Sequence, residues 1–227
     1  MAVPELGLHE EIMLLALREE EGTVHSSASY HFALSAAALA ELLLRGVVEL
    51  DEGTKRRLVT LPKKEAQGDP LLDECIGRLE SAKRRASLQD WVWKLSGIKG
   101  IKDKVALELC RKGVLRADED KVLLIFSRKI YPERDPRPEK NIRERMRRAI
   151  FGTSASVVPR TAILISLAHS TGLLNTCFDK KKLRARKRRI EQIAAGDRMG
   201  KAAKEAIDAA HAALVVTTCI VPMIVAS

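Results

Sequence analysis

Two segments of the chain are apolar on several faces, and they predict a central pair of helices. Residues 30–46, YHFALSAAALAELLLRG, contain one acidic residue, Glu41, before Arg45. Residues 160–174, RTAILISLAHSTGLL, are similarly apolar. A helix that is apolar all round must be covered by other elements. We therefore expect both helices at the centre of the fold.

Other segments carry apolar residues at helical spacing on one face only, which predicts amphipathic helices around that centre. In residues 6–22 the apolar face consists of Leu8, Ile12, Leu15 and Ala16, and the adjacent acids Glu10 and Glu11 are expected on a solvated surface. Similar patterns occupy the following segments: residues 70–86, 88–96, 98–109, with Ile98, Ile101, Val105 and Leu109, and 141–151, with Ile142, Met146 and Ile150. Trp91 and Trp93 are expected to be packing residues.

The spacing of apolar residues changes from helical to strand-like in residues 47–61 and again in residues 114–131. Each of these stretches predicts a β-hairpin. Each follows a helix that ends in a basic residue and glycine, so residues 41–48 and 108–115 form a weak internal repeat. The apolar run 212–227 contains Pro222 and is shorter than the roughly 20 residues that span a bilayer. We expect it to be a buried core helix. The predicted fold is mainly α, a central hydrophobic helix bundle wrapped by amphipathic helices with one or two small hairpins, in a single domain 1–227.

The charge balance points to an anionic partner. The chain of 227 residues has a formal net charge of +10 and a pI of about 9.6. Such a protein favours nucleic acid or an anionic membrane surface, and charge alone does not choose between them. The start of the chain lacks the basic and apolar regions of a signal peptide, and the four scattered cysteines form no CxxC pair. We expect free thiols in a reducing, cytoplasmic setting.

No residue pattern indicates catalysis. The histidines form no HExxH motif, and the chain has neither a GxSxG nor a phosphate-binding P-loop. His169, on an apolar helix, is expected to be a core histidine. We therefore expect no enzyme activity, no metal site and no cofactor.

Three lysines stand where a helix would disfavour them. Lys99, Lys102 and Lys104 lie in or beside the first turn of the helix predicted after Gly100. A lysine there opposes the helix dipole by roughly 0.3–1 kcal/mol when exposed. An anion bound to the lysines and to the N–H groups of the turn would offset that cost. The alternative is that Asp103 pairs with Lys99 and the other lysines are solvated.

A second basic feature is the run KKKLRARKRR, which has eight basic residues between Lys180 and Arg189. Five of them are predicted to face a membrane: Lys180, Lys181, Lys182, Arg184 and Arg186. Near a negatively charged leaflet each basic residue contributes about 1 kcal/mol. The alternative is a solvated basic helix face.

Several stretches, in a fixed order over nearly the whole chain, resemble the Golgi phosphoprotein 3 family, also called GPP34. They are LGLHEEIMLLALREEEG, LAELLLRGVVEL, DPLLDECIGRL, LELCRKGVL with its hairpin, and ILISLAHSTGLL. The resemblance implies a mainly α domain. Eukaryotic members bind phosphatidylinositol 4-phosphate on the cytosolic face of Golgi membranes, and act as adaptors that retain glycosyltransferases through cytoplasmic tails and coat proteins. The sequence begins almost at the matching stretches, without the basic N-terminal arm of those members, and we therefore expect a compact, bacterial relative.

The same resemblance assigns site residues. Two basic residues of the family's lipid pocket match Lys99 and Lys102, and Lys104 matches a nearby basic position. The pocket's tryptophan and arginine fall near Ser26 and at Ser35. Ser35 is expected to donate one neutral hydrogen bond to the headgroup.

The leading hypothesis is a peripheral membrane protein that binds anionic phospholipid headgroups, phosphatidylinositol 4-phosphate by resemblance. It would lie on the cytosolic membrane face, at the Golgi if the source is eukaryotic. Further partners are a second copy, through the hairpin at 114–131, or membrane-protein tails. The alternative is a nucleic-acid-binding protein with winged-helix-like units, against which stands the apolar helix at 30–46, whose side chains could not read base edges.

Overall fold

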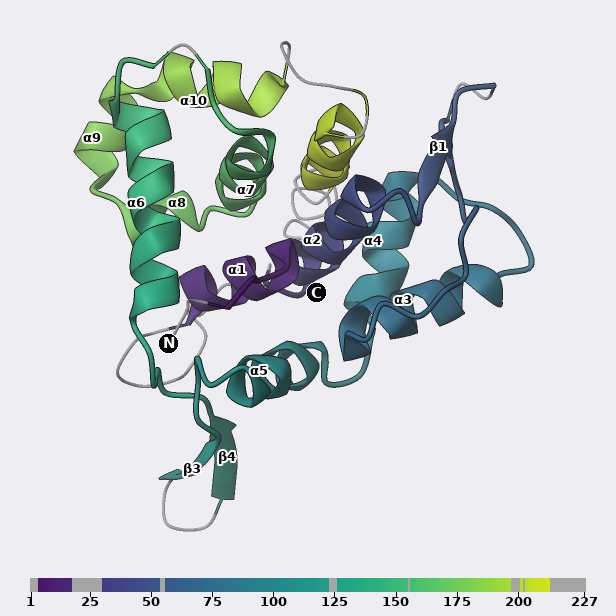
Figure 1. Cartoon of the computed structure of the whole chain (residues 1–227), viewed down its shortest axis with the longest axis horizontal. Helices are drawn as coiled ribbons and strands as arrows, with labels where there is room; N and C mark the ends of the chain where they lie inside the picture. The colour runs from purple at the N-terminus through teal and green to yellow at the C-terminus, as the bar shows by residue number, and fades with distance from the viewer. Residues whose placement is uncertain are drawn as a thin grey trace, which may run out of the picture.

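The computed structural model describes residues 4–17, 30–53, 56–122, 126–154, 156–196, 201 and 203–212. Its helices are α1 (Leu8–Ala16), α2 (Tyr30–Leu44), α3 (Pro70–Glu80), α4 (Leu88–Ser96), α5 (Ile101–Arg111), α6 (Arg137–Phe151), α7 (Pro159–Ser170), α8 (Leu174–Cys177), α9 (Lys180–Ala185) and α10 (Lys187–Ala195). Residues 203–212 form a further helical segment. Figure 1 shows α1 and α2 crossing the middle of the molecule, with the other helices around them. The mainly α prediction is confirmed.

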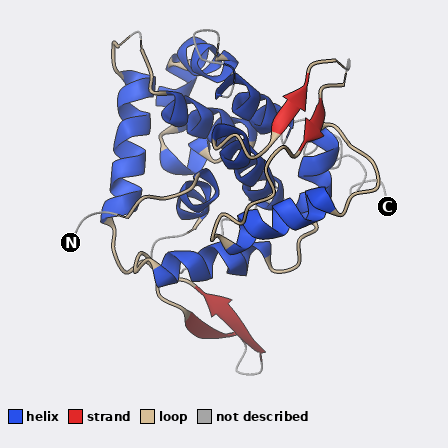
Figure 2. Ribbon diagram, turned by 45° about the vertical axis from the view of Figure 1, so that its right-hand side comes forward, coloured by secondary structure: helices blue, strands red, loops and turns tan. Residues whose placement is uncertain are grey.

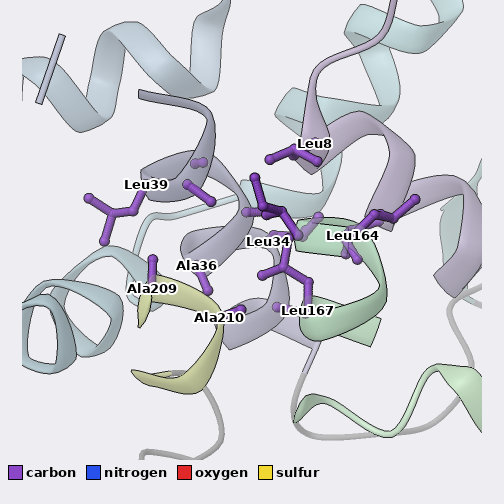
Figure 3. Packing of buried hydrophobic residues seen from close by; sticks show 14 of the residues in the cluster. Leu8, Leu34, Ala36, Leu39, Leu164, Leu167, Ala209 and Ala210 are labelled. Carbon is purple, nitrogen blue, oxygen red and sulfur yellow. The ribbon is translucent and has the colours of Figure 1, made fainter. Parts of the chain in front are cut away.

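The helices that are apolar on several faces form the centre of the core. Every residue of α1 is buried, and α2 is buried from Ala33 to Leu43. In Figure 3, Leu34 of α2 lies among Leu8 of α1 and Leu164 and Leu167 of α7. Helices α2 and α7 are buried because neither has a polar stripe wide enough to face water, whereas α1, predicted to be amphipathic, buries Glu10 and Glu11 by pairing them with bases of other elements.

The outer helices bury one face each, as their spacing predicts. In α6 the buried stripe includes Ile142, Met146 and Ile150, while arginines and glutamates cover the other faces. In α5 the stripe consists of Ile101, Val105 and Leu109. These stripes hold the outer helices against the core and fix which side chains point outward.

Two hairpins form two separate two-stranded antiparallel sheets (Figure 2). Strand β1 (Glu49–Asp51) pairs with β2 (Leu58–Thr60), with Leu50 opposite Val59. Strand β3 (Asp118–Val122) pairs with β4 (Phe126–Ile130), and this second hairpin projects from the body near α5 (Figure 1). Both predicted hairpins are confirmed. The apolar run predicted to be a core helix, residues 212–227, lies outside the described residues except for Ala212, which is buried.

Two predictions about single helix positions are wrong. Glu10 and Glu11 are 1% and 4% exposed rather than solvated, because α1 has no face left open to water. His169 is exposed at the end of α7. Among the described residues the buried histidine is His9, which is 1% exposed and contacts Asp69 at 2.9 Å.

Candidate functional site

The lysine-bearing turn begins at Gly100. Its φ of 68° lies in the left-handed region that glycine adopts without strain, and α5 starts at the next residue. The side chains of Ile98 and Ile101 are buried on either side of it. This arrangement leaves Lys99 exposed just before the helix, and no described residue forms an ion pair with it.

Lys102 lies one residue into α5, over an aromatic ring. Its Nζ is 5.4 Å from the ring centroid of Tyr131, which follows β4. The Tyr131 hydroxyl donates a hydrogen bond of 2.8 Å to Asp103 Oδ1. Burial, together with that hydrogen bond, raises the pKa of Tyr131. Asp103 therefore binds Tyr131, and the predicted alternative pairing with Lys99 is not formed.

Lys104 points to a different neighbour. Its Nζ forms an ion pair of 3.0 Å with Glu74 Oε2 on α3, and Glu74 also binds Arg78 at 2.9 Å. Burial alone would raise the pKa of Glu74, but the bonds from Lys104 and Arg78 outweigh it and lower that pKa. Lys99 is exposed and Lys102 is half-buried over the Tyr131 ring, and we call these two residues the lysine site.

Ser35 does not belong to this site. It is 0% exposed, and its hydroxyl donates a hydrogen bond of 2.7 Å to the carbonyl of His31 one turn earlier in α2. The expected bond from Ser35 to a headgroup is thus not available in this structure, because α2 is buried along this stretch.

An aromatic pair near the start of α2 is a feature that sequence reasoning missed. Trp93 of α4 is 53% exposed and stacks on Phe32, with ring centroids 5.9 Å apart and an interplanar angle of 21°. Trp91 is 3% exposed. The packing prediction is right for Trp91 and wrong for Trp93, because helix residues two apart point to nearly opposite faces. That spacing was the signal available in the sequence.

The second predicted basic set lies elsewhere. Its members are exposed on α9 and just after it, and we call them the α9 cluster: Lys180, Lys181, Lys182, Arg184 and Arg186. Leu183 is buried and anchors this short helix. The Arg186 guanidinium donates a hydrogen bond of 3.2 Å to the carbonyl of Phe151 at the end of α6. Figure 1 shows α9 well apart from α5. The two basic sets therefore do not form one binding site.

The comparison with family models bears on the whole fold. The model for Golgi phosphoprotein 3 (GPP34) matches residues 8–210, from the start of α1 to the final helical segment. The chain belongs to the GPP34 family. A GPP34 relative, vacuolar protein sorting-associated protein 74 of Schizosaccharomyces pombe, is 27% identical over 162 residues, which is 63% of this chain. The match covers 48% of that relative, so the chain spans about half the length of the curated relative it matches.

At the start of α1, this GPP34 chain holds a buried network of charges. Glu10 accepts hydrogen bonds of 2.7 Å from Lys112 Nζ and from the Gly7 amide. Glu11 binds Arg145 of α6, and burial raises the pKa of Glu11 despite that arginine. The carboxylates of α1 are thus paired with bases from distant parts of the chain.

Glu41 of α2 extends this network. It accepts hydrogen bonds from the Leu8 amide at 2.8 Å and from Arg160 of α7 at 3.0 Å. Burial would raise the pKa of Glu41, but Arg160 and the Leu8 amide lower it. Two cavities, of about 230 and 220 Å³, lie beside this network. They are lined by its paired charges and contain neither Lys99 nor Lys102.

The structure also bears on other kinds of site. Within the described ranges, no three His, Cys, Asp or Glu side chains gather as ligands of a metal ion. Among the same residues, no helix combines the length and apolar character that crossing a bilayer requires. The helix before the first hairpin, α2, is buried between other helices and cannot enter a nucleic-acid groove.

Proposed function

We propose that this GPP34 chain is a peripheral membrane protein that binds anionic phospholipid headgroups through the lysine site. The observation that carries the proposal is the pair Lys99 and Lys102 at the first turn of α5, where the helix dipole favours a negative ligand. Family membership and the net charge of +10 support the same ligand class.

The chemistry of the turn suits a phosphate. The first N–H groups of a helix have no intrahelical acceptors, and an anion at this end receives both their hydrogen bonds and the attraction of the dipole. Two ammonium groups add charge-assisted bonds, which are stronger than neutral ones. A bound headgroup would offset the roughly 0.3–1 kcal/mol that each lysine costs at this helix end.

We infer that charge, more than headgroup shape, decides which lipid binds. The family's pocket tryptophan and arginine fall near Ser26 and at Ser35 here, and Ser35 is buried. Phosphatidylinositol 4-phosphate is therefore proposed as the most highly charged member of a series that includes phosphatidylserine. We propose a cytosolic membrane face as the location, at the Golgi in a eukaryotic source.

We also propose an adaptor role, because the chain belongs to the GPP34 family. The β3–β4 hairpin projects from the body and could contact a second copy, and membrane-protein tails are the other proposed partner (Figure 1). Size-exclusion chromatography with light scattering tests self-association. A monomer at all concentrations would remove the second copy as a partner.

Vesicle flotation tests the lipid proposal. We expect the chain to float with vesicles that contain phosphatidylserine or phosphatidylinositol 4-phosphate, and not with pure phosphatidylcholine. The double variant Lys99→Glu/Lys102→Glu should bind about tenfold or more weakly, because two attractive charges become repulsive. A loss of less than about twofold would remove the lysine site.

The matched control is Lys83→Glu/Lys140→Glu, two exposed lysines from other parts of the chain with the same change in net charge. It should bind vesicles nearly as well as the parent. A mobility-shift assay with duplex DNA completes the test. Tight, salt-sensitive retardation without vesicle binding would favour the nucleic-acid alternative.

A further inference from the structure

Trp93 is a large apolar side chain that the fold leaves in water. Among the described residues, three large hydrophobic side chains are strongly exposed: Trp93 at 53%, Leu107 at 49% and Val158 at 68%. Of these, only Trp93 combines a large apolar surface with a polar N–H. Tryptophan with this exposure is enriched where proteins meet the interface of a bilayer.

The indole is held in place before any partner arrives. Trp91, Val92 and Leu95 bury the inner face of α4, and Ser87 and Asp90 cap its first turn. Stacking on Phe32 supports the exposed ring from the side of α2. Because the helix and the ring are already ordered, binding through Trp93 would lose little conformational entropy.

Exposed basic residues lie close to this ring in the sequence. Lys94 is exposed next to it and lies over Trp91, with Nζ 4.8 Å from the ring centroid. Lys99 is exposed six residues after Trp93, beyond the end of α4. Such a combination of an amphipathic ring and basic side chains is complementary to an anionic bilayer, which offers both an apolar boundary and negative headgroups.

Contacts between elements connect Trp93 to the lysine site. Trp93 stacks on Phe32, and Tyr30 lies two residues earlier in α2. Helix α2 also packs against α5, the helix whose first turn carries Lys102. Helix α2 therefore contacts both the helix that carries Trp93 and the helix that carries Lys102.

We propose that Trp93 inserts its indole into the headgroup–acyl boundary of an anionic bilayer, while Lys94, Lys99 and Lys102 bind the surrounding headgroups. This inference rests on the proposed function and adds an anchor to it. The anchor comes from α4, whereas the family's pocket tryptophan falls near Ser26, in the segment after α1. Insertion would add apolar burial to an otherwise electrostatic attachment.

The chain contains two tryptophans, which allows each to be observed alone. The variant Trp91→Phe leaves Trp93 as the fluorophore, and Trp93→Phe leaves the buried Trp91. Each is mixed with phosphatidylcholine vesicles with or without about one-third phosphatidylserine, a content that gives a negative surface potential. A second series contains lipids brominated at shallow acyl positions, which quench indoles that enter the boundary.

Trp93 should shift its emission to the blue and be quenched in the anionic vesicles and not in the neutral ones. Trp91 should show neither change. Replacing Trp93 by Ala should weaken vesicle binding by about tenfold, and most of that loss should persist at high salt, since burial of apolar surface is not screened. If Trp91→Phe does not fold, quenching is measured on the parent and on Trp93→Phe. The difference between the two gives the quenching of Trp93.

The outcomes separate the two claims. Vesicle binding by the parent without a shift or quenching of Trp93 overturns the anchor and leaves the headgroup proposal intact. No vesicle binding by the parent overturns both. A blue shift of Trp93 that grows with protein concentration, in the absence of vesicles, shows that the ring contacts a second copy, and it also overturns the anchor.

Discussion

Lys112 Nζ donates a hydrogen bond of 2.7 Å to Glu10 Oε2, 102 positions away in the chain. Glu10 lies in the first turn of α1 and is 1% exposed, while the lysine side chain is 23% exposed. The pair joins the end of α5 to the most buried helix of the fold. A buried carboxylate that loses its partner keeps its full desolvation cost.

The variant Lys112→Met should therefore lower the free energy of unfolding by about 3–5 kcal/mol. Adding Glu10→Gln should restore a large part of the loss, because the remaining amide carries no charge to desolvate. Urea unfolding followed by circular dichroism measures both, with Lys140→Met as the exposed control. Equal stability of the single and double variants would mean that the charge of Glu10 is compensated by another group.

Asp69 makes the free energy of unfolding depend on pH in the acid range. It accepts hydrogen bonds of 3.0 Å from the amides of Leu71 and Leu72 at the start of α3 and contacts His9 at 2.9 Å. Burial alone would raise its pKa, but the contact with His9 and the two amides lower it from 3.8 to about 2. The folded state thus binds its proton less tightly than the unfolded chain does.

The sign of the pH effect follows from that depression. The stabilisation from Asp69 is complete above pH 3.8 and is lost as the pH falls through 3.8 toward about 2. Asp69→Asn should have a lower free energy of unfolding than the parent at neutral pH. The difference between the two proteins should shrink as the pH falls from 3.8 toward about 2. Urea unfolding at several pH values measures the gap, and Glu65→Gln is the exposed control. A gap independent of pH would contradict this assignment.

The two tryptophans should differ sharply in their contribution to stability. Trp91→Ala leaves a cavity in the core and should cost about 3–5 kcal/mol. Trp93→Ala loses a stacked contact with Phe32 in a half-exposed setting and should cost about 1 kcal/mol. Chemical denaturation of both variants measures this difference. Similar losses would mean that Trp93 is a structural residue, and its proposed role in binding would lose support.

The α9 cluster is predicted to add long-range attraction to the membrane. Lys181→Glu/Arg184→Glu should weaken binding to phosphatidylserine vesicles by about thirtyfold or more at low salt, at roughly 1 kcal/mol for each basic residue near the leaflet. The effect should shrink at high salt, where charges are screened. Unchanged flotation at low salt, compared with Lys83→Glu/Lys140→Glu, would assign the α9 cluster to a solvated helix face.

The sequence predicts the fold well where one pattern determines the burial of a helix. Residues 30–46 and 160–174 lack a polar stripe, and they form α2 and α7 at the centre. In α5 the apolar stripe fixes the direction of the remaining side chains. Lys99 precedes this helix, and its exposure was predictable because the apolar residues Ile98 and Ile101 bury the two sides of the Gly100 turn. The burial of Ser35 was predictable too, since its helix is apolar all round.

The charged centre of the molecule could not be predicted in the same way. Nothing near Glu10 and Glu11 in the sequence shows that Lys112 and Arg145 will cover them, because these bases come from α6 and the end of α5. The pairing of Lys104 with Glu74 likewise depends on how α3 packs against α5. Such pairs are decided by tertiary packing, and a single sequence carries no local signal for them.

The order in which a ribosome makes the chain gives the α1 network a further consequence. Helix α1 leaves the exit tunnel before the other described helices, yet Arg145 is made 134 residues after its partner Glu11, and Arg160 is made 119 residues after Glu41 of α2. Until then the innermost helix has no complete set of counter-charges. We expect nascent chains stalled before Arg160 has emerged to be cut readily by protease, and resistance to appear once α7 is outside the tunnel.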